Sequence, residues 1–328
     1  MNKPDIKNCP GTLAEGFDSS SRNCLKRMFE GRKVPHTLPY DSPGSESESE
    51  ALFMDNQKRI SISGVQEKFS VLLEKNKLRL IREGERGTYI LKPIPLFGKN
   101  RDQMPANEQV TMQIARQVYK IETAENALVF FRDGSPAYLT RRFDVREDGS
   151  KWGQEDFASL GQRTPQTHGE GYKYEGSYLE LFQLMKQYLP AYKVEAPKLL
   201  KILMFSYLFS NGDAHFKNFS VLETEMGDYR LSPAYDLLNS RMHIDDEDFA
   251  LKKGLLPMAQ AQGNISKQFA QLAREAEIGD KIFQKNRGDM LSQSDSVKKM
   301  IDASFLSEKM KRNYGQAYQR RLKKLGKV

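Results

Sequence analysis

The chain has 328 residues, of which 38% are hydrophobic, and a formal net charge of +8. This length suffices for one two-lobed unit or two domains, and the composition is typical of a water-soluble globular protein. The longest apolar segment, residues 199–209, contains a lysine and a serine and is far shorter than the roughly 20 residues that span a bilayer. Since no apolar stretch follows the charges at the N-terminus, we expect a cytoplasmic protein without a membrane partner.

The positive charge is concentrated near the C-terminus. Residues 309–327 contain Lys309, Lys311, Arg312, Arg320, Arg321, Lys323, Lys324 and Lys327. A solvated C-terminal helix explains this run, and so does a surface for nucleic acid or for an acidic protein.

Cys9 and Cys24 are the only cysteines, and their spacing is compatible with a disulfide, a zinc site or two free thiols. Structural zinc usually needs four ligands, and even with His36 this region offers only three. We therefore expect free thiols.

The first part of the chain has few periodic features. It ends in residues 39–53, which are rich in Pro, Ser and Glu. Such a composition cannot bury enough apolar surface to offset the entropy of ordering, so it predicts a linker or loop. We expect an N-terminal extension and linker over residues 1–50.

Residues 51–146 are predicted to be rich in strands. Alternating apolar residues at 59–81 and at 87–95 indicate three strands of a small antiparallel sheet. Residues 104–121 place Val110, Ile114, Ala115 and Val118 at helical spacing, which predicts one helix. Residues 126–145 then indicate a hairpin with its turn at 132–136.

Residues 147–328 are predicted to be mostly helical. Helices are expected in 154–161, 176–189 and 196–211 and in amphipathic stretches after residue 258, whereas 163–177 is expected to be a long loop. The fold class expected is α+β, with a sheet-rich first part and a helical second part.

Polar residues are crowded after the apolar helix that ends near residue 211. They are Asp213, His215, Lys217, Asn218 and, after a short strand, Asp236. An aspartate there can accept a hydroxyl proton, a lysine can neutralise phosphate charge, and the oxygens of an asparagine and a second aspartate suit Mg²⁺. This set favours phosphoryl transfer. The alternative is that these residues serve only as turn and capping residues and as a solvated surface charge.

A second group of candidate residues lies in the sheet region. Residues 61–68, with the single glycine Gly64, could offer backbone N–H groups and hydroxyls to phosphates, although an ordinary hairpin turn is the alternative. Lys92 ends an apolar strand, where an ammonium needs a phosphate or a carboxylate. Glu108 on the following helix is the available carboxylate.

These motifs resemble those of the HipA-like toxin serine/threonine protein kinases. The likeness covers about residues 55–240 and rests, in family order, on SISGVQEKFSVLL, YILKP, NEQ, RRFDV, QEDFASLG, NGDAHFKNFSV and SPAYDLL. It implies a two-lobed protein-kinase-like fold with an N-lobe at 51–146 and a C-lobe at 147–328, the latter ending in the basic helix.

The resemblance also implies roles for individual residues. Asp213 is the implied catalytic base, and Asn218 and Asp236 are the implied magnesium ligands. Ser61 is the implied autophosphorylation site, and Ser63 offers a second acceptor where longer family members carry a small residue. Glu108 is expected from its place on the following helix to hold Lys92. Contacts to ATP are implied for Ser63, Gly64, Val65, Gln66, Glu67, Lys68, Lys92, Arg141, Arg142, Phe143, His215, Phe216, Lys217, Asn218, Tyr235 and Asp236.

Longer family members carry a larger subdomain before the phosphate loop, so the chain is more similar to the short HipT-type kinases, in which that subdomain is a separate antitoxin protein. The expected function is that of a toxin-type kinase which uses ATP and Mg²⁺. The implied substrate is a translation protein such as an aminoacyl-tRNA synthetase. The implied partners are a small antitoxin and a DNA-binding repressor, with DNA contacted only indirectly.

Two other functions remain compatible with the sequence. One is a catalytically repressed component that binds an antitoxin and a DNA-bound repressor through its basic tail. The other is a kinase for a small molecule or a lipid. The complete set of Asp213, Asn218 and Asp236 favours an active kinase.

Overall fold

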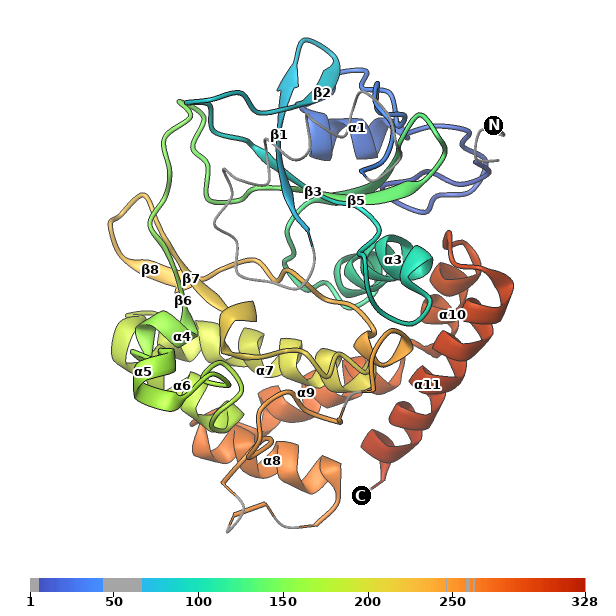
Figure 1. The fold of residues 1–328 in the computed structure, drawn as a ribbon. Coiled ribbons are helices and arrows are strands. Elements are labelled where there is room, and N and C mark those ends of the chain that lie inside the picture. Colours follow the sequence, from blue (N-terminus) through green and yellow to red (C-terminus); the bar gives the residue numbers. More distant parts are fainter. Residues whose placement is uncertain (1–5, 44–66, 246, 258–259, 262, 328) are drawn as a thin grey trace. The chain divides into compact units, whose positions relative to one another are not determined.

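The computed structural model describes residues 6–43, 67–245, 247–257, 260–261 and 263–327 (Figure 1). The chain forms two compact units. The first comprises residues 1–114, 124–149 and 299–311, and the second comprises 115–123, 150–298 and 312–328. None of the helices in the described ranges has the length and apolar character needed to span a membrane.

The first unit contains a five-stranded antiparallel sheet with the strand order β2-β1-β3-β5-β4. Its strands are β1 (Phe69–Glu74), β2 (Lys77–Leu80), β3 (Tyr89–Lys92), β4 (Asn126–Phe130) and β5 (Pro136–Arg141). Leu91 is opposite Phe69 on one side and Leu139 on the other, so apolar side chains on three neighbouring strands share one face. The described parts of the expected strands and of the expected hairpin are confirmed, whereas residues 59–66 lie outside the described ranges.

A helix follows β3, as the periodicity predicted. The short 3₁₀ helix η1 (Arg101–Gln103) leads into α3 (Met104–Gln117). Val110, Ile114 and Ala115 are fully buried, which agrees with the predicted apolar face, and Glu108 and Gln109 on the same helix are buried as well. Because polar side chains are also buried, α3 carries more than a simple amphipathic stripe.

The described N-terminal residues belong to the core of the first unit, although the sequence suggested an extension. Helix α1 (Arg22–Phe29) begins where the Ser21 side chain accepts a hydrogen bond from Cys24 N. It lies against the sheet (Figure 1), and apolar side chains between residues 9 and 40 join the sheet residues in one buried cluster. Residues 36–38 also pair with Phe130, since Leu38 N donates to its carbonyl at 2.7 Å. The expected linker from residue 44 onward lies outside the described ranges.

Cys9 and Cys24 are free thiols, and both are buried. Cys9 Sγ accepts a hydrogen bond from Ser21 N at 3.2 Å. The hydrogen bond from Cys24 lowers the pKa of Cys9, and the same bond, together with burial, raises the pKa of Cys24. Gly11 packs so closely on this pair that a Cβ atom added there would overlap Cys24 Sγ.

The second unit contains a three-stranded antiparallel sheet. Its strands are β6 (Gln154–Asp156), β7 (Ser220–Glu223) and β8 (Tyr229–Leu231). A helix was expected over the whole of 154–161, and this is wrong for its first three residues. Helix α4 spans only Phe157–Leu160, because the Asp156 side chain caps it by accepting from Ser159 N. The expected loop at 163–177 contains one helical turn, α5 (Pro165–His168).

The remaining helices agree with the predicted helical second part. They are α6 (Tyr178–Tyr188), α7 (Tyr192–Leu208), α8 (Ile265–Glu275), α9 (Asp280–Leu291), α10 (Ser294–Asp302) and α11 (Glu308–Gly326). Helix α7 is apolar on nearly all sides and fully buried toward its end. At its C-terminus Phe209 stacks on Phe205 at 4.3 Å and on Tyr318 at 5.1 Å between ring centroids.

The basic helix α11 buries one face and exposes the other. Tyr314, Tyr318 and Leu325 are buried, while Arg320 is among the basic residues on the exposed face. Arg321 is buried, pairs with Asp248 at 2.5 Å and lies 4.6 Å above the Tyr207 ring. Arg321 therefore belongs to the core, and both interpretations of the exposed basic face remain compatible with the structure.

The close packing of Gly11 generates a prediction about stability. Gly11→Ala should lower the free energy of unfolding by about 1–3 kcal/mol, because the added methyl group overpacks a full core. The cost should shrink in a Cys24→Ala background, where Sγ is absent. Urea denaturation of the four chains measures both effects, and an equal cost in the two backgrounds would contradict the contact.

Candidate active site

The turn after α7 is held by a serine from a later segment. Ser240 Oγ accepts a hydrogen bond from Gly212 N at 2.8 Å and donates one to the Ser210 carbonyl at 3.2 Å. Ser210 has a φ of 54°, a left-handed conformation that is unusual for a residue with a side chain. These bonds fix the direction in which the chain leaves the helix, so Asp213 is presented from a rigid base.

Asp213 combines exposure with a fixed position. Its side chain is 43% exposed, which makes it accessible from solvent. The Tyr174 hydroxyl donates a hydrogen bond to its Oδ1 at 2.9 Å, and His215 Nε2 lies 4.0 Å from the same oxygen. The expected base is thus an accessible carboxylate with one oxygen held by a tyrosine.

His215 is neutral at physiological pH. Burial, together with the charge of Lys173, lowers the pKa of His215 to about 3. Its ring stands edge-on to the Tyr174 ring at 5.1 Å between centroids. His215 therefore contributes packing to this loop and no positive charge.

Asn218 closes the 3₁₀ helix η2 (Phe216–Asn218). Its Oδ1 accepts from His215 N at 3.2 Å, and its own N–H donates to the His215 carbonyl at 2.9 Å. The Phe216 ring is fully buried beneath the Arg163 guanidinium, which lies 3.9 Å from the ring centroid. The amide oxygen of Asn218 is an oxygen donor of the kind that Mg²⁺ prefers.

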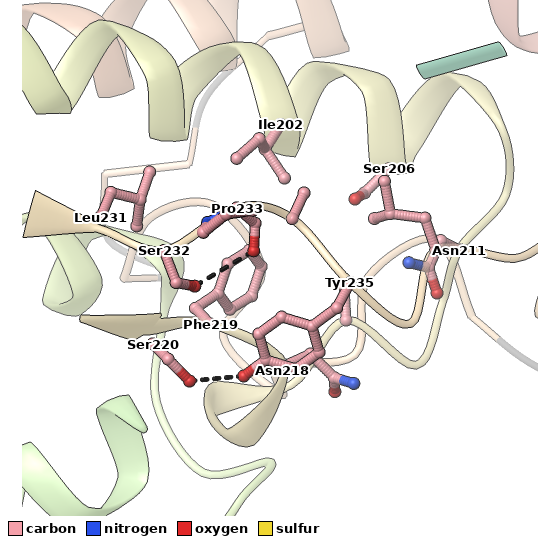
Figure 2. A pocket seen from close by; sticks show the side chains of 13 residues that line it. Ile202, Ser206, Asn211, Asn218, Phe219, Ser220, Leu231, Ser232, Pro233 and Tyr235 are labelled. Carbon is pink, nitrogen blue, oxygen red and sulfur yellow. Dashed lines mark hydrogen bonds between the residues drawn. The ribbon is translucent and has the colours of Figure 1, made fainter. Parts of the chain in front are cut away.

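Tyr235 and Asp236 lie next to this loop within the second unit. The Tyr235 hydroxyl donates to the Lys217 carbonyl at 3.0 Å and lies 2.5 Å from Ser220 Oγ (Figure 2). Burial raises the pKa of Tyr235, so the hydroxyl stays protonated. Asp236 has a φ of 54°, and its charge acts on His215. A strained aspartate held beside the candidate loop is typical of a functional site.

A small cavity, lined in part by Asn218 and Tyr235, lies between α7, residues 218–220 and residues 231–237 (Figure 2). Its volume is about 10 Å³. Ligand pockets typically measure about 300–1,000 Å³, so this cavity holds about one water molecule and no nucleotide. The nucleotide expected from the sequence would have to bind elsewhere on these residues.

The first unit contains a buried ion pair. Lys92 at the end of β3 and Glu108 on α3 are 2.6 Å apart between Nζ and Oε1, and their side chains are only 4% and 2% exposed. The Lys92 ammonium also lies 5.3 Å from the centroid of the Tyr138 ring. The structure thus places Glu108 in contact with Lys92. The role of this pair and a contact of Lys92 with phosphate stay predictions.

Other candidate residues of the first unit are held by polar contacts. Arg141 Nη2 donates to Glu30 at 2.6 Å. Arg142 forms two bonds with Asp144, at 2.9 and 2.5 Å, and its backbone N–H donates to the Thr88 carbonyl. Both arginine side chains thus have partners within the chain. Half-buried Phe143 follows them, and half-buried Glu67 and Lys68 directly precede β1. Ser61, Ser63, Gly64, Val65 and Gln66 lie outside the described ranges.

Sequence reasoning missed the contribution of residues 163–178 to this site. The segment supplies Tyr174 to Asp213, and the Tyr178 hydroxyl donates to the Ala214 carbonyl at 2.8 Å. Tyrosines alternating with Lys173 in a stretch without helical or strand periodicity were the available signal. Such a signal does not identify the residues that the tyrosines contact, because these lie 36 and 39 positions further along the sequence.

The model of the HipA-like C-terminal domain matches residues 60–304. A protein of Sinorhizobium fredii named as a candidate kinase, Y4dM, is 29% identical over an alignment of 284 residues, and the match covers 80% of this chain and 66% of that protein. A protein of Haemophilus influenzae, also named as a candidate kinase, is 24% identical over 93% of this chain and 88% of its own length. The chain thus spans slightly less than two thirds of the first relative.

A solved structure shares the fold. It is the HipA protein of Shewanella oneidensis, in a complex with HipB and operator DNA. It matches with a TM-score of 0.62 and 20% identity over 80% of this chain and 63% of that chain. The likeness confirms the expected α+β fold with a sheet-rich N-terminal part and a helical C-terminal part.

The buried pair of Lys92 and Glu108 leads to a prediction about stability. Lys92→Met should cost about 3–5 kcal/mol of unfolding free energy, because it leaves Glu108 buried without its cation. The double variant Lys92→Met/Glu108→Leu should recover most of this loss. Chemical denaturation of the three chains measures both effects, and a stable single variant would show that Glu108 does not depend on Lys92.

Proposed function

The chain belongs to the family of HipA-like C-terminal domains, and from this premise we propose that it is an ATP-dependent serine/threonine protein kinase. The observation that carries the proposal is the accessible Asp213 carboxylate on a fixed turn, with Asn218 and Asp236 on the adjoining segments. Kinases need little covalent chemistry from the protein. They need positioning of the acceptor and neutralisation of the phosphate charge.

In this proposal Asp213 accepts the proton of the acceptor hydroxyl as its oxygen attacks the γ-phosphorus. General bases of this kind contribute about 10²–10⁴-fold to the rate. Because its pKa is lowered to about 3, His215 is a poor proton acceptor, which leaves the Asp213 carboxylate as the candidate base on this turn. The fixed turn supports a defined approach of the acceptor.

Asn218 and Asp236 are the residues proposed to hold Mg²⁺. Both offer oxygen atoms, and Mg²⁺ in kinases is usually held by one or two such side chains together with phosphate oxygens and water. Among the described residues no group of three or more His, Cys, Asp and Glu side chains could hold a metal ion without such help. When bound, Mg²⁺ would neutralise charge on the β- and γ-phosphates.

The ion pair of the first unit fits the same chemistry. Lys92 ends a strand, and Glu108 lies on the helix that follows it. Protein kinases use a strand lysine, oriented by a helix glutamate, to contact the nucleotide phosphates. We assign this role to Lys92 and the orienting role to Glu108.

The biological setting proposed is a toxin–antitoxin system. The Shewanella HipA structure contains HipB and operator DNA, which supports a small antitoxin and a DNA-binding repressor as partners of this chain. The subtype proposed is the short HipT-type, which the sequence motifs resemble. The proposed substrate is an aminoacyl-tRNA synthetase. Labelled ATP distinguishes this function from a repressed component, which labels nothing, and from a small-molecule or lipid kinase, which labels no protein.

The proposal predicts the loss of phosphoryl transfer in two variants. Asp213→Asn should lower the turnover rate by about 10²–10⁴-fold, because an amide cannot accept the proton. Asp236→Asn should raise the Mg²⁺ concentration needed for half-maximal activity. Transfer from labelled ATP measures both effects, and Asp228→Asn, in the exposed turn between β7 and β8, is the matched control. Full activity of Asp213→Asn would remove the kinase assignment from this site.

The proposal also includes autophosphorylation at Ser61 or Ser63. A phosphate carries a charge of about −1.5 to −2, so on the proposed phosphate loop it should repel ATP and lower activity. Mass spectrometry of the wild type and of Asp213→Gln, each incubated with ATP and Mg²⁺, should find phosphate only on the wild type. Equal modification of both chains would point to another kinase, and a fully active Ser61→Asp/Ser63→Asp chain would exclude the inhibitory role.

A further inference from the structure

A segment of the second unit, made of the turns and bends of residues 172–177 and of Tyr178 at the start of α6, is held to the chain at residues 252–255. Lys252 N donates to the Tyr174 carbonyl and Lys253 N to the Gly176 carbonyl, both at 3.0 Å. In return, Tyr178 N donates to the Gly254 carbonyl at 3.0 Å. Residues 172–178 belong to no strand, but these backbone hydrogen bonds hold them to residues 252–255 as the bonds between two paired strands would.

The same segment contacts the Asp213 turn at three points. The Lys173 carbonyl accepts from Phe216 N at 3.2 Å, and the Tyr178 hydroxyl donates to the Ala214 carbonyl at 2.8 Å. Between these backbone contacts, the Tyr174 hydroxyl donates to the Asp213 carboxylate at 2.9 Å. Two contacts thus fix the backbone that follows Asp213, and the third fixes its side chain.

Arg163 anchors the other side of the segment. Its Nη1 donates to the Glu175 carbonyl at 2.5 Å, its Nη2 pairs with Glu180, and its guanidinium covers the Phe216 ring. Gly176 permits this arrangement, because its φ is 112° and a Cβ atom there would come within 2.8 Å of the Glu180 carboxylate. Hydrogen bonds thus hold the chain on both sides of Tyr174, so this residue has little freedom to move.

We propose that Tyr174 is a positioning residue for phosphoryl transfer, and that its hydroxyl holds the Asp213 carboxylate in the orientation that receives the acceptor proton. The inference rests on the proposed function. In the step itself, the acceptor oxygen forms a bond to the γ-phosphorus, the bond from that phosphorus to the ADP oxygen breaks, and the acceptor proton moves to Asp213. Tyr174 keeps its own proton throughout.

The hydrogen bond also affects the charge state of the base. A hydroxyl that donates to a carboxylate favours the ionised form. The titratable and charged groups around this turn include His215, which is neutral, and Lys173, Lys217 and Asp236, whose charges act on His215. None of these is altered by removing one hydroxyl oxygen, so the contribution of Tyr174 can be measured by itself.

The test compares Tyr174→Phe with Tyr172→Phe in the full-length chain. Tyr172 lies on the same segment, and its hydroxyl forms no hydrogen bond with any residue that the structure describes. With ATP and Mg²⁺ as the probe and ADP release as the readout, Tyr174→Phe should lower kcat by about 10- to 100-fold, because a small misplacement of a catalytic group has this effect. The KM for ATP should not change, and Tyr172→Phe should behave as the wild type does.

A second readout does not depend on turnover. Carboxyl carbon NMR of chains with ¹³C-labelled aspartate, assigned with Asp213→Asn, gives the pKa of Asp213 directly. Tyr174→Phe should raise this pKa, because the ionised carboxylate loses a hydrogen bond, and the acid limb of the kcat profile should move in the same direction. Tyr178→Phe is the structural comparator, because it removes a bond to the Ala214 carbonyl without touching the carboxylate, and it should leave the pKa unchanged.

The outcomes separate the inference from the proposed function. If the wild type transfers no phosphate, the kinase proposal fails, and the NMR titration alone decides whether Tyr174 holds Asp213. If the wild type is active and Tyr174→Phe keeps its kcat and its pKa, Tyr174 is only a packing residue and the inference is overturned. An equal pKa shift in Tyr178→Phe would assign the effect to general loosening of the turn, which also overturns it.

Discussion

The buried aromatic stack at the end of α7 is the constraint on which the second unit depends. Phe205, Phe209 and Tyr318 pack face to face there, and Tyr119 meets both phenylalanines edge-on. A close-packed interior does not deform continuously, so the end of α7 cannot shift without opening this core. Asp213 follows four residues later on a turn that Ser240 closes. The packing of apolar side chains thus sets the position of the accessible Asp213 carboxylate.

The two units handle charge in opposite ways. The first buries an ammonium and a carboxylate against each other, with almost no exposure. Such a pair contributes little net stability, because desolvation offsets most of the attraction, so stability is a weak reason for its presence. The second unit leaves Asp213 accessible and keeps His215 neutral through burial.

The parts of the fold that follow local periodicity could be predicted from the sequence. The core helix α7, the helix α3 and the hairpin of β4 and β5 each carry an apolar pattern within a single segment. The packing of residues 6–43 could not be predicted, because it depends on pairing with Phe130, which is more than ninety residues distant. The boundary between β6 and α4 could not be predicted either, because it depends on the Asp156 side chain capping the helix.

The candidate site was predictable to a similar extent. The crowding of Asp213, Asn218 and Asp236 is visible in the sequence, and so is the need of Lys92 for a carboxylate. The contact of Tyr174 with Asp213 is a tertiary contact without a local pattern, so only the structure reveals it. The phosphate-loop residues from Ser61 to Gln66 lie outside the described ranges, and their roles stay predictions.

The burial of Arg321 changes how the basic C-terminal run can be studied. Asp248 and the Tyr207 ring hold this arginine inside the second unit, and Tyr314 and Tyr318 on the same helix belong to the core. A deletion designed to remove the positive charge would therefore also remove part of the apolar interior, and any loss of partner binding would be confounded by unfolding. Reversing the charge of residues on the solvent face, such as Arg320 and Lys323, separates electrostatic attraction from structural integrity.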